Sequence, residues 1–220
     1  MDGRAARWAG QRETRRAEVV AAALLAIAEH GPQVSTEQIT DRAAIARPTL
    51  YRHFADADDL HDAVARRIGE LLVGELAPTM RHPSGSAREI IGRIVRTYVA
   101  WLAGNDHLYR YLVSRSLAEQ QPAAAVRLRV GEQLRELLGS YVVLLGGDAR
   151  VVDPLAFGLI GMVETAALRW VTSPDPLLDR DGLVEHLTGW AWGSLDVALR
   201  AIGVELDPDF PLPELPRHEG

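Results

Sequence analysis

Residues 46–54, ARPTLYRHF, place long polar side chains at most positions of a short segment. At about 100° per residue in a helix, Leu50 and Phe54 lie within about 40° of each other and can face a core. The outward and flanking positions are then Arg47, Pro48, Thr49, Tyr51, Arg52 and His53. Arginine pairs bidentately with guanine, threonine contacts a thymine methyl group or a phosphate, and tyrosine and histidine reach phosphates. The pattern predicts a helix that reads DNA.

A short helix and a tight turn must position this polar helix. Ser35 and Gln38 form a capping-box pattern, which predicts the start of the short helix. Residues 44–46 then form a turn before the polar helix, which is expected over 47–53. Two short helices joined by such a turn, and backed by the longer helix expected over 12–30, have helix-turn-helix geometry.

The remaining residues also carry helical periodicity, and no long alternating strand pattern interrupts it. The expected helices span residues 56–76, with Asp56 as N-cap, and then 86–103, 105–116, 123–145, 153–171 and 182–202. Ser86 with Glu89 forms a second capping box, and Asp153 followed by Pro154 is typical of a helix start. Residues 78–86, PTMRHPSGS, have the composition of a linker. The chain is therefore predicted to be all-α.

The expected organisation has four parts. They are a flexible basic arm at residues 1–11, a three-helix helix-turn-helix DNA-binding domain at 12–56, a larger helical domain at 57–205 and a proline-rich tail, extended or disordered, at 206–220. Residues 1–54 carry eight arginines and six acidic residues, whereas the rest of the chain carries 16 arginines and 24 acidic residues. A weakly basic head on an acidic body can bind DNA locally, although the net charge of −6 argues against a generic nucleic-acid binder.

Composition argues against several other classes of protein. The 220 residues include no cysteine, which excludes disulfides, thiolate nucleophiles and cysteine-ligated metals, and all 24 basic residues are arginine. The seven histidines show no HExxH pattern, and no serine lies in a G-x-S-x-G elbow. We therefore expect no metal, no cofactor and no enzymatic activity. No apolar run approaches the roughly 20 residues of a membrane span, and no signal peptide is evident, so we expect a cytoplasmic protein without membrane contact.

The predicted motif resembles the DNA-binding signature of a known family. The segment STEQITDRAAIARPTLYRHFADADDL, residues 35–60, is similar to that of TetR-type (tetracycline-repressor-like) transcriptional regulators. The similarity extends over residues 12–65, and beyond residue 70 it is limited to length, helical content and a two-helix C-terminal end. The resemblance implies a homodimer whose heads bind a palindromic double-stranded DNA operator and whose body binds a small effector that releases the DNA.

The resemblance also implies a role for each residue of the motif. These roles are a phosphate contact for Thr36, base-edge contacts for Arg47, Pro48 and Thr49, a phosphate contact for Tyr51 with His53 beside it, and a further outward contact for Arg52.

Four positions depart from the family pattern. Ala44 replaces the usual glycine of the turn, which predicts a less comfortable backbone angle there, and Ala46 replaces a common serine cap. Ala57 replaces a common lysine, and Glu37 stands where some members have a base-reading arginine. These departures predict weaker affinity for the DNA backbone per head, offset by the five arginines that precede Ala17.

The body implied by the resemblance should contain an apolar pocket for a small apolar or aromatic effector. Bulky side chains at the spacing of inward residues are the candidates for its lining, together with polar residues that could orient a ligand. They are Tyr98, Trp101, Tyr109, Phe157, Met162 and Trp170, with Asn105, His107 and Glu164 as the polar group. The alternative for the bulky residues is ordinary core packing, and the alternative for Glu164 is a position facing solvent or an arginine.

Small residues in the last two long helices permit close helix approach. The resemblance places a four-helix dimer interface there, with Gly158, Gly161, Thr165, Leu187, Trp190 and Leu195 as its candidate residues. The alternative is that these residues pack the same two helices within one chain.

The sequence is thus interpreted as that of a homodimeric, ligand-responsive transcriptional repressor. One alternative is a dimeric DNA-binding regulator without a small-molecule sensor, which responds to a protein partner. The other is a helical enzyme or structural bundle with a vestigial head.

Overall fold

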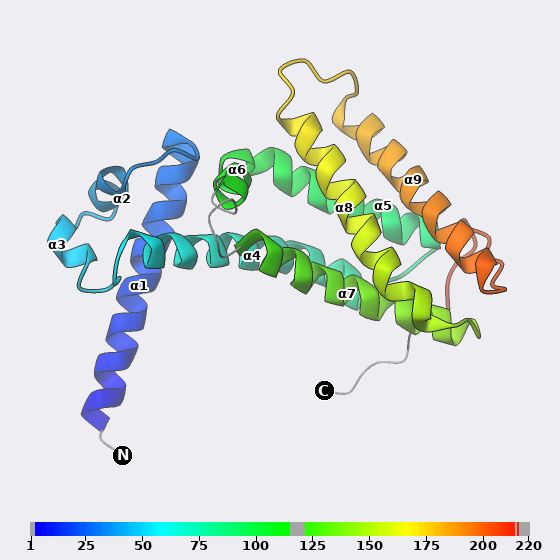
Figure 1. Ribbon diagram of the computed structural model, residues 1–220, viewed down its shortest axis with the longest axis horizontal. Helices are drawn as coiled ribbons and strands as arrows, with labels where there is room; N and C mark the ends of the chain where they lie inside the picture. The colour runs from blue at the N-terminus through cyan, green and yellow to red at the C-terminus, as the bar shows by residue number, and fades with distance from the viewer. Residues whose placement is uncertain (1–2, 115–121, 214, 216–220) are drawn as a thin grey trace. The chain divides into compact units, whose positions relative to one another are not determined.

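The computed structural model of the protein describes residues 3–114, 122–213 and 215. The elements in these ranges are α1 (Gly3–His30), α2 (Thr36–Arg42), α3 (Arg47–Leu50), α4 (Ala57–Arg81), α5 (Ala87–Gly104), α6 (Asp106–Ser114), α7 (Pro122–Leu144), the 3-10 turn η2 (Ala149–Val151), α8 (Val152–Val171) and α9 (Arg180–Ala201) (Figure 1). No strand occurs in the described ranges, so the all-α prediction is confirmed.

The chain divides into two compact units. The first comprises residues up to Leu71 and Asn105–Val126, and the second comprises Leu72–Gly104 and the residues from Arg127 onward. α1, α2, α3, α6 and the beginning of α4 therefore belong to the first unit, which contains the predicted DNA-binding motif. α5, α8, α9 and most of α7 belong to the second unit.

The first unit is built around a small apolar core to which the helix-turn-helix contributes. α1 packs against α2 and α6, and α2 packs against α3. Ile27 of α1, Ile39 of α2, and Leu50 and Phe54 in and after α3 are at most 1% exposed. The inward direction predicted for Leu50 and Phe54 from their spacing is therefore confirmed.

Local capping signals set the start of a helix in each unit. The Gln38 N–H donates to the Ser35 hydroxyl at 3.2 Å, and the Ser35 N–H donates to the Gln38 side chain at 2.8 Å. Ser86 and Glu89 form the same reciprocal pair at the start of α5. Both predicted capping boxes are therefore confirmed.

Two long helices extend beyond their expected ends. α1 begins at Gly3, so residues 3–11 continue the helix and do not form a separate flexible arm. α4 continues through Pro78 to Arg81, although residues 78–86 were expected to be a linker. The His82 N–H donates to the Pro78 carbonyl at 3.1 Å, so the last turn closes after the proline and satisfies the backbone there.

Two other helix boundaries also differ from the expectation. α3 ends at Leu50 and not at residue 53, because the His53 and Phe54 N–H groups both donate to the Leu50 carbonyl and close a tight turn. Asp153 is not an N-cap but lies in the first turn of α8, and Asp148 caps the preceding 3-10 turn instead. The last residues of the helix expected over 105–116 lie outside the described residues.

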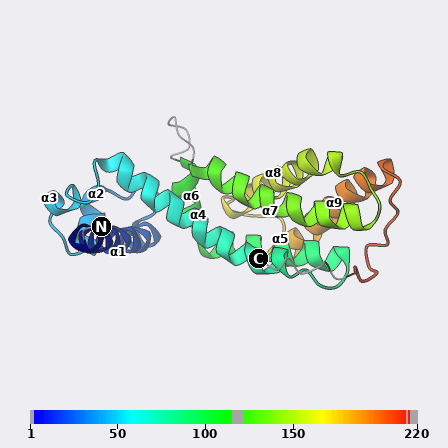
Figure 2. The ribbon, with the colours of Figure 1, turned by 90° about the horizontal axis from the view of Figure 1, so that it is seen from below.

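In the second unit, α5 packs against both α8 and α9, and α8 packs against α9 (Figures 1 and 2). Gly92 of α5 allows close approach to α9, since a Cβ atom there would lie 3.7 Å from the Thr188 side chain. The Thr188 hydroxyl donates to the Val184 carbonyl at 2.7 Å, so this buried polar group is satisfied. Trp192, Leu195 and other apolar residues form the core between these helices.

The residues after α9 include a non-helical segment, Leu206–Leu212, which we call the strap. The Arg88 N–H donates to the Pro208 carbonyl at 3.0 Å, and the Leu212 N–H donates to the Gly85 carbonyl at 2.9 Å. The Arg88 side chain also pairs with Asp209 at 2.8 Å. The predicted tail is thus attached over these residues and contains a turn, in which the Phe210 N–H donates to the Asp207 carbonyl at 3.3 Å, whereas Glu214 and residues 216–220 lie outside the described residues.

α8 is unusually apolar. The segment Ala149–Val171 is long and apolar enough by composition to cross a membrane, with a mean hydropathy of 1.6, which corrects the expectation that no such run exists. Core helices of soluble proteins have the same composition, and α8 packs against α5 and α9. Only 17% of its apolar window is buried, so its own chain covers this helix incompletely.

The turn between α2 and α3 carries a strained residue. Ala44 has a φ of +52° and is the single described non-glycine residue with a positive φ. The uncomfortable backbone angle predicted from the missing glycine is therefore confirmed, because a side chain in this conformation meets the following carbonyl oxygen.

The substitution Ala44→Gly should raise the free energy of unfolding by about 0.5–1 kcal/mol, since it removes this strain at a modest cost in unfolded-state entropy. Chemical denaturation measures the change. Ala43→Gly is the matched control, because Ala43 has an ordinary φ of −78° and glycine there should destabilise the protein. If both substitutions shift stability in the same direction, strain at Ala44 is not the cause.

Candidate nucleic-acid interface

α3 and the turn after it present the predicted DNA-binding residues to solvent. Arg47, Pro48 and Arg52 are exposed, and Tyr51 is 39% exposed. Thr49 is half-buried. The Arg47 guanidinium lies 5.9 Å from the centre of the Tyr51 ring, so the two side chains support each other on the outer surface.

The start of α3 has no side-chain cap, as the alanine at position 46 predicts. The cost of the missing cap is small here for a local reason. Pro48 has no N–H to satisfy, and the Thr49 N–H already donates to the Ala46 carbonyl at 2.8 Å. A serine at position 46 would therefore gain less than the roughly 1 kcal/mol typical of an N-cap.

The two predicted flanking contacts are both half-buried. Thr36 is the first residue of α2 and is half-buried, next to the exposed Glu37. His53 is also half-buried, and its Nδ1 atom is buried without a hydrogen-bond partner among the described residues. Only the other edge of the His53 ring can therefore reach a phosphate.

Arg16 of α1 takes part in a structural contact, although it is one of the five arginines before Ala17 that were expected to support DNA binding. Its guanidinium donates to both carboxylate oxygens of Asp59 at 2.7 and 2.9 Å and to the His53 carbonyl at 2.5 Å. It also lies 4.3 Å from the centre of the Phe54 ring. We call this set of contacts the Arg16 clamp; it joins α1, the turn after α3 and the first turn of α4.

Asp59 forms hydrogen bonds with three partners. Besides Arg16, the Ala55 N–H donates to its carboxylate at 3.0 Å. Its own N–H donates to the Asp56 side chain at 2.9 Å, which confirms Asp56 as the N-cap of α4. The hydrogen bond from Arg16, followed by that from Ala55, lowers the pKa of Asp59 from 3.8 to about 2.

Three of the predicted sensor residues lie in the first unit. Tyr109 is 3% exposed and is one of the buried residues of α6. The His107 ring lies within hydrogen-bonding distance, 3.0 Å, of the Ala28 carbonyl of α1. Asn105 is half-buried at the start of α6. These three residues therefore belong to the unit that contains the DNA-binding motif.

The other predicted sensor residues lie in the second unit and take part in packing. A Cβ atom at Gly131 would lie 2.3 Å from the Phe157 ring, so Phe157 fills the space beside α7. Glu164 pairs with Arg127 at 2.8 Å, which is the alternative that the sequence left open for it. The remaining members are Tyr98 and Trp101, which are buried, and Met162 and Trp170, which are half-buried.

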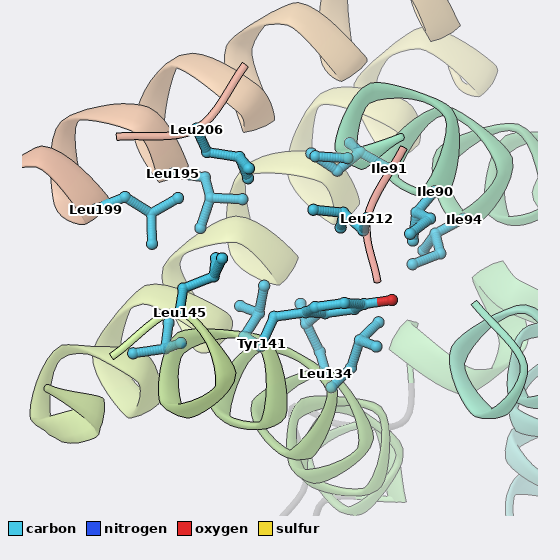
Figure 3. A pocket seen from close by; sticks show the side chains of 14 residues that line it. Ile90, Ile91, Ile94, Leu134, Tyr141, Leu145, Leu195, Leu199, Leu206 and Leu212 are labelled. Atoms are coloured by element: carbon cyan, nitrogen blue, oxygen red, sulfur yellow. The ribbon is translucent and has the colours of Figure 1, made fainter. Parts of the chain in front are cut away.

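A cavity of about 60 Å³ does occur in the second unit, but its lining includes none of the nine predicted sensor residues. The lining consists instead of aliphatic side chains from α5, α7, α9 and the strap, together with Tyr141 (Figure 3). Branched aliphatic residues carry no signal that separates a cavity wall from ordinary core, so the sequence could not single them out.

The predicted dimer residues fall into two groups. Leu187 and Leu195 are buried within their own chain, at 0% and 7% exposed. The accessible members are Gly158, Gly161, Thr165 and Trp190, of which Trp190 is 52% exposed. Only the second group can contribute to a surface between two chains.

An exposed basic and aromatic helix on a three-helix scaffold defines a helix-turn-helix DNA-binding protein. The family described as bacterial regulatory proteins, tetR family, matches residues 19–64, from α1 to the start of α4. An uncharacterised HTH-type transcriptional regulator of Mycobacterium tuberculosis is 30% identical over 197 residues, which cover 88% of this chain and 82% of that relative. The chain therefore belongs to the TetR family of transcriptional regulators, whose members are not enzymes.

Two further similarities extend over most of the chain. The HTH-type transcriptional activator FasR of Mycolicibacterium smegmatis is 25% identical over 186 residues, 84% of each protein. The crystal structure of a TetR-family regulator from Streptomyces coelicolor superposes with a TM-score of 0.70 at 20% identity, covering 86% of this chain and 83% of that one. The second similarity concerns the fold alone.

The Arg16 clamp should make stability depend on pH. The pKa of Asp59 is lower in the folded protein, about 2, than its ordinary value of 3.8. The stabilisation is therefore complete above about pH 5 and is lost as the pH falls toward 2. The substitution Arg16→Met should lower the free energy of unfolding at neutral pH by about 1–2 kcal/mol and flatten this acid dependence.

Arg15→Met is the matched control, because Arg15 forms an exposed pair with Glu18 one turn away on α1. It should change stability by no more than about 0.5 kcal/mol. Denaturation at a series of pH values measures both variants, and equal effects would contradict a special role for Arg16.

Proposed function

We propose that the protein is a cytoplasmic homodimer that represses transcription by binding a palindromic operator and is released by a small apolar effector. The observation that carries the DNA-binding part is the outward display of Arg47, Thr49 and Tyr51 above the buried Leu50 and Phe54. A two-fold dimer presents two such helices to successive major grooves, about 34–36 Å or somewhat more apart.

The proposed contacts divide into base readers and phosphate anchors. They are Arg47, Pro48, Thr49 and Arg52 at base edges, and Thr36, Tyr51 and His53 at phosphates. Arg16 is excluded from this set because its guanidinium is occupied by Asp59 and the His53 carbonyl. The accessible cations therefore include Arg47 of α3, Arg52 in the turn after it, and the exposed positions of α1, such as Arg12 and Arg15.

A second copy of the chain is the proposed cover for α8 and α9. Incomplete burial of the apolar α8 supports this, as do the exposed Trp190 and Val197 of α9, at 52% and 69%. The accessible glycines Gly158 and Gly189 lack side chains that would keep two helices apart. A symmetric four-helix contact between α8 and α9 of two chains would remove this apolar surface from water.

The third part of the proposal is an effector site in the second unit. The six predicted sensor residues of that unit stay candidates for it, and the aliphatic cavity offers a separate site of apolar character. The alternative is a regulator that lacks a small-molecule sensor and responds to a protein partner. A thermal-shift screen distinguishes the two hypotheses. Apolar ligands should raise the melting temperature if the protein has an effector site, whereas no apolar ligand should change it if the second unit has no such site.

Activation of transcription is a second candidate, because the relative FasR is named an activator. Both functions use the same operator-binding head. The position of the operator relative to the promoter decides between them, so mapping that position by footprinting distinguishes repression from activation.

The purified dimer should bind DNA from upstream of its own gene tightly, with affinity that falls steeply as salt rises. Arg47→Ala should weaken this binding by roughly 10- to 100-fold, since a bidentate base contact is worth about 1–3 kcal/mol. Fluorescence anisotropy with operator and unrelated DNA measures the difference.

Arg42→Ala serves as the matched control, because Arg42 is exposed on α2, pairs with Glu29 at 3.4 Å and lies outside the proposed contact set. It should change affinity by less than about threefold. If the protein does not prefer the upstream DNA to unrelated DNA, its binding sequence is first selected from a pool of fragments of the whole genome. Unchanged affinity of Arg47→Ala for the selected sequence would refute the proposed reading head.

Trp190→Arg should convert the dimer into a monomer, because it places an unpaired charge in the centre of the proposed apolar contact. Size-exclusion chromatography with light scattering measures the mass. Leu128→Arg is the control, since Leu128 is 55% exposed but belongs to α7, which is outside the proposed contact between α8 and α9 of two chains. A Trp190→Arg variant that stays dimeric would place the interface elsewhere.

A further inference from the structure

The cavity of the second unit has an unusually uniform lining. Thirteen of its fourteen lining residues have hydrocarbon side chains, and the hydroxyl of Tyr141 is the only polar side-chain group (Figure 3). Tyr141 is 8% exposed, and its burial raises the pKa of this hydroxyl, which therefore stays neutral. A charged or strongly polar molecule would lose its hydration in this space without compensation.

The size of the cavity restricts what it can hold as it stands. Its volume is about 60 Å³. Typical ligand sites have volumes of about 300–1,000 Å³, so a complete ligand enters only if a wall moves. Aliphatic walls with a single hydroxyl favour a flexible hydrocarbon chain over a ring system that carries several polar groups.

The strap is a non-helical wall of the cavity, and its Leu206 and Leu212 pack against the core. It contributes Leu206 and Leu212 to the lining, whereas α5, α7 and α9 supply the rest (Figure 3). Two backbone hydrogen bonds and the Arg88–Asp209 pair hold it, and the side chains of that pair are 43% and 66% exposed. Exposed ion pairs contribute little, and segments with few buried contacts open most readily.

The junction between α9 and the strap can act as a pivot. Gly203 has a φ of +80°, a backbone angle that side chains disfavour. The Val204 N–H donates to the Leu199 carbonyl at 2.9 Å, so the chain is anchored to α9 before the strap begins. The strap can therefore move without unwinding α9.

We propose that the cavity binds the alkyl chain of an aliphatic carboxylate and that the strap is its intramolecular competitor. Asp209 lies midway between Leu206 and Leu212, so the strap itself presents a carboxylate flanked by branched hydrocarbon groups. A ligand with an unbranched chain offers the same groups in one molecule. Its chain takes the places of Leu206 and Leu212, and its carboxylate takes the place of Asp209 at Arg88.

An effect of the ligand on DNA binding rests on the proposed function, because the strap follows α9, one of the proposed dimer helices. Binding of the ligand to the cavity does not depend on the proposed function. Binding is therefore measured on the full-length protein without DNA, so that failure of the site and failure of the regulatory proposal are separate results.

Decanoate is the probe, and calorimetric titration measures its affinity. Wild-type protein should bind it, and Leu212→Ser should bind it about 3- to 10-fold more tightly, because a weakened competitor leaves a larger fraction of sites open. Phe210→Ala is the matched control, since Phe210 lies in the strap but is 67% exposed and does not line the cavity. It should leave the affinity unchanged.

Two further measurements locate the ligand. Ala87→Leu fills the cavity from α5 and should abolish binding of decanoate. If this variant does not fold, Val142→Leu, which fills the cavity from α7, is used in its place. Decyltrimethylammonium, which has the same chain with a cationic head, should bind at least about 10-fold more weakly because Arg88 repels it. Amide hydrogen exchange over residues 204–213 should speed up when decanoate binds.

Three results would overturn the proposal. They are the absence of decanoate binding, binding that cavity filling does not change, and a loss of affinity in Leu212→Ser without faster exchange of the strap. The last result would make the strap a fixed wall and not a competitor. If decanoate binds as expected but leaves operator affinity unchanged, the site stands and the proposed release of DNA by this ligand fails.

Discussion

The placement of α3 depends on the guanidinium group of Arg16. α3 has four residues, too few for its own helical hydrogen bonds to fix its position. The burial of Leu50 and Phe54 anchors one side, and Arg16 secures the other by joining the His53 carbonyl to Asp59. The exposed side chains of α3 therefore depend for their orientation on a contact made by α1.

The sequence predicts best those features that arise between close neighbours. The capping box of Ser35 and Gln38 is visible because its hydrogen bonds join residues three apart, and the inward direction of Leu50 follows from helical periodicity alone. The partner of Arg16 is 43 residues away, and nothing local distinguishes Arg16 from Arg15. Its structural role therefore required the folded arrangement of three segments.

The body of the protein illustrates a second limit. Helical spacing correctly indicates that Tyr98 and Trp101 are buried, at 8% and 9% exposed. Periodicity does not reveal which inward side chains meet a void, because that depends on how neighbouring helices and the strap fit together. The cavity wall supplied by Leu212 could not be anticipated, since the proline-rich composition of the tail carries no information on where it attaches.

The exposed cations of the head are all guanidinium groups, since the chain contains no lysine. A guanidinium group in a protein does not give up its proton, so acidification or alkalinisation of the cell leaves the attraction of α3 to phosphate intact. Acetylation, which neutralises lysine, finds no side chain to modify here. The guanidinium groups of the head therefore keep their charge under both influences, and ionic strength is what modulates their attraction to phosphate.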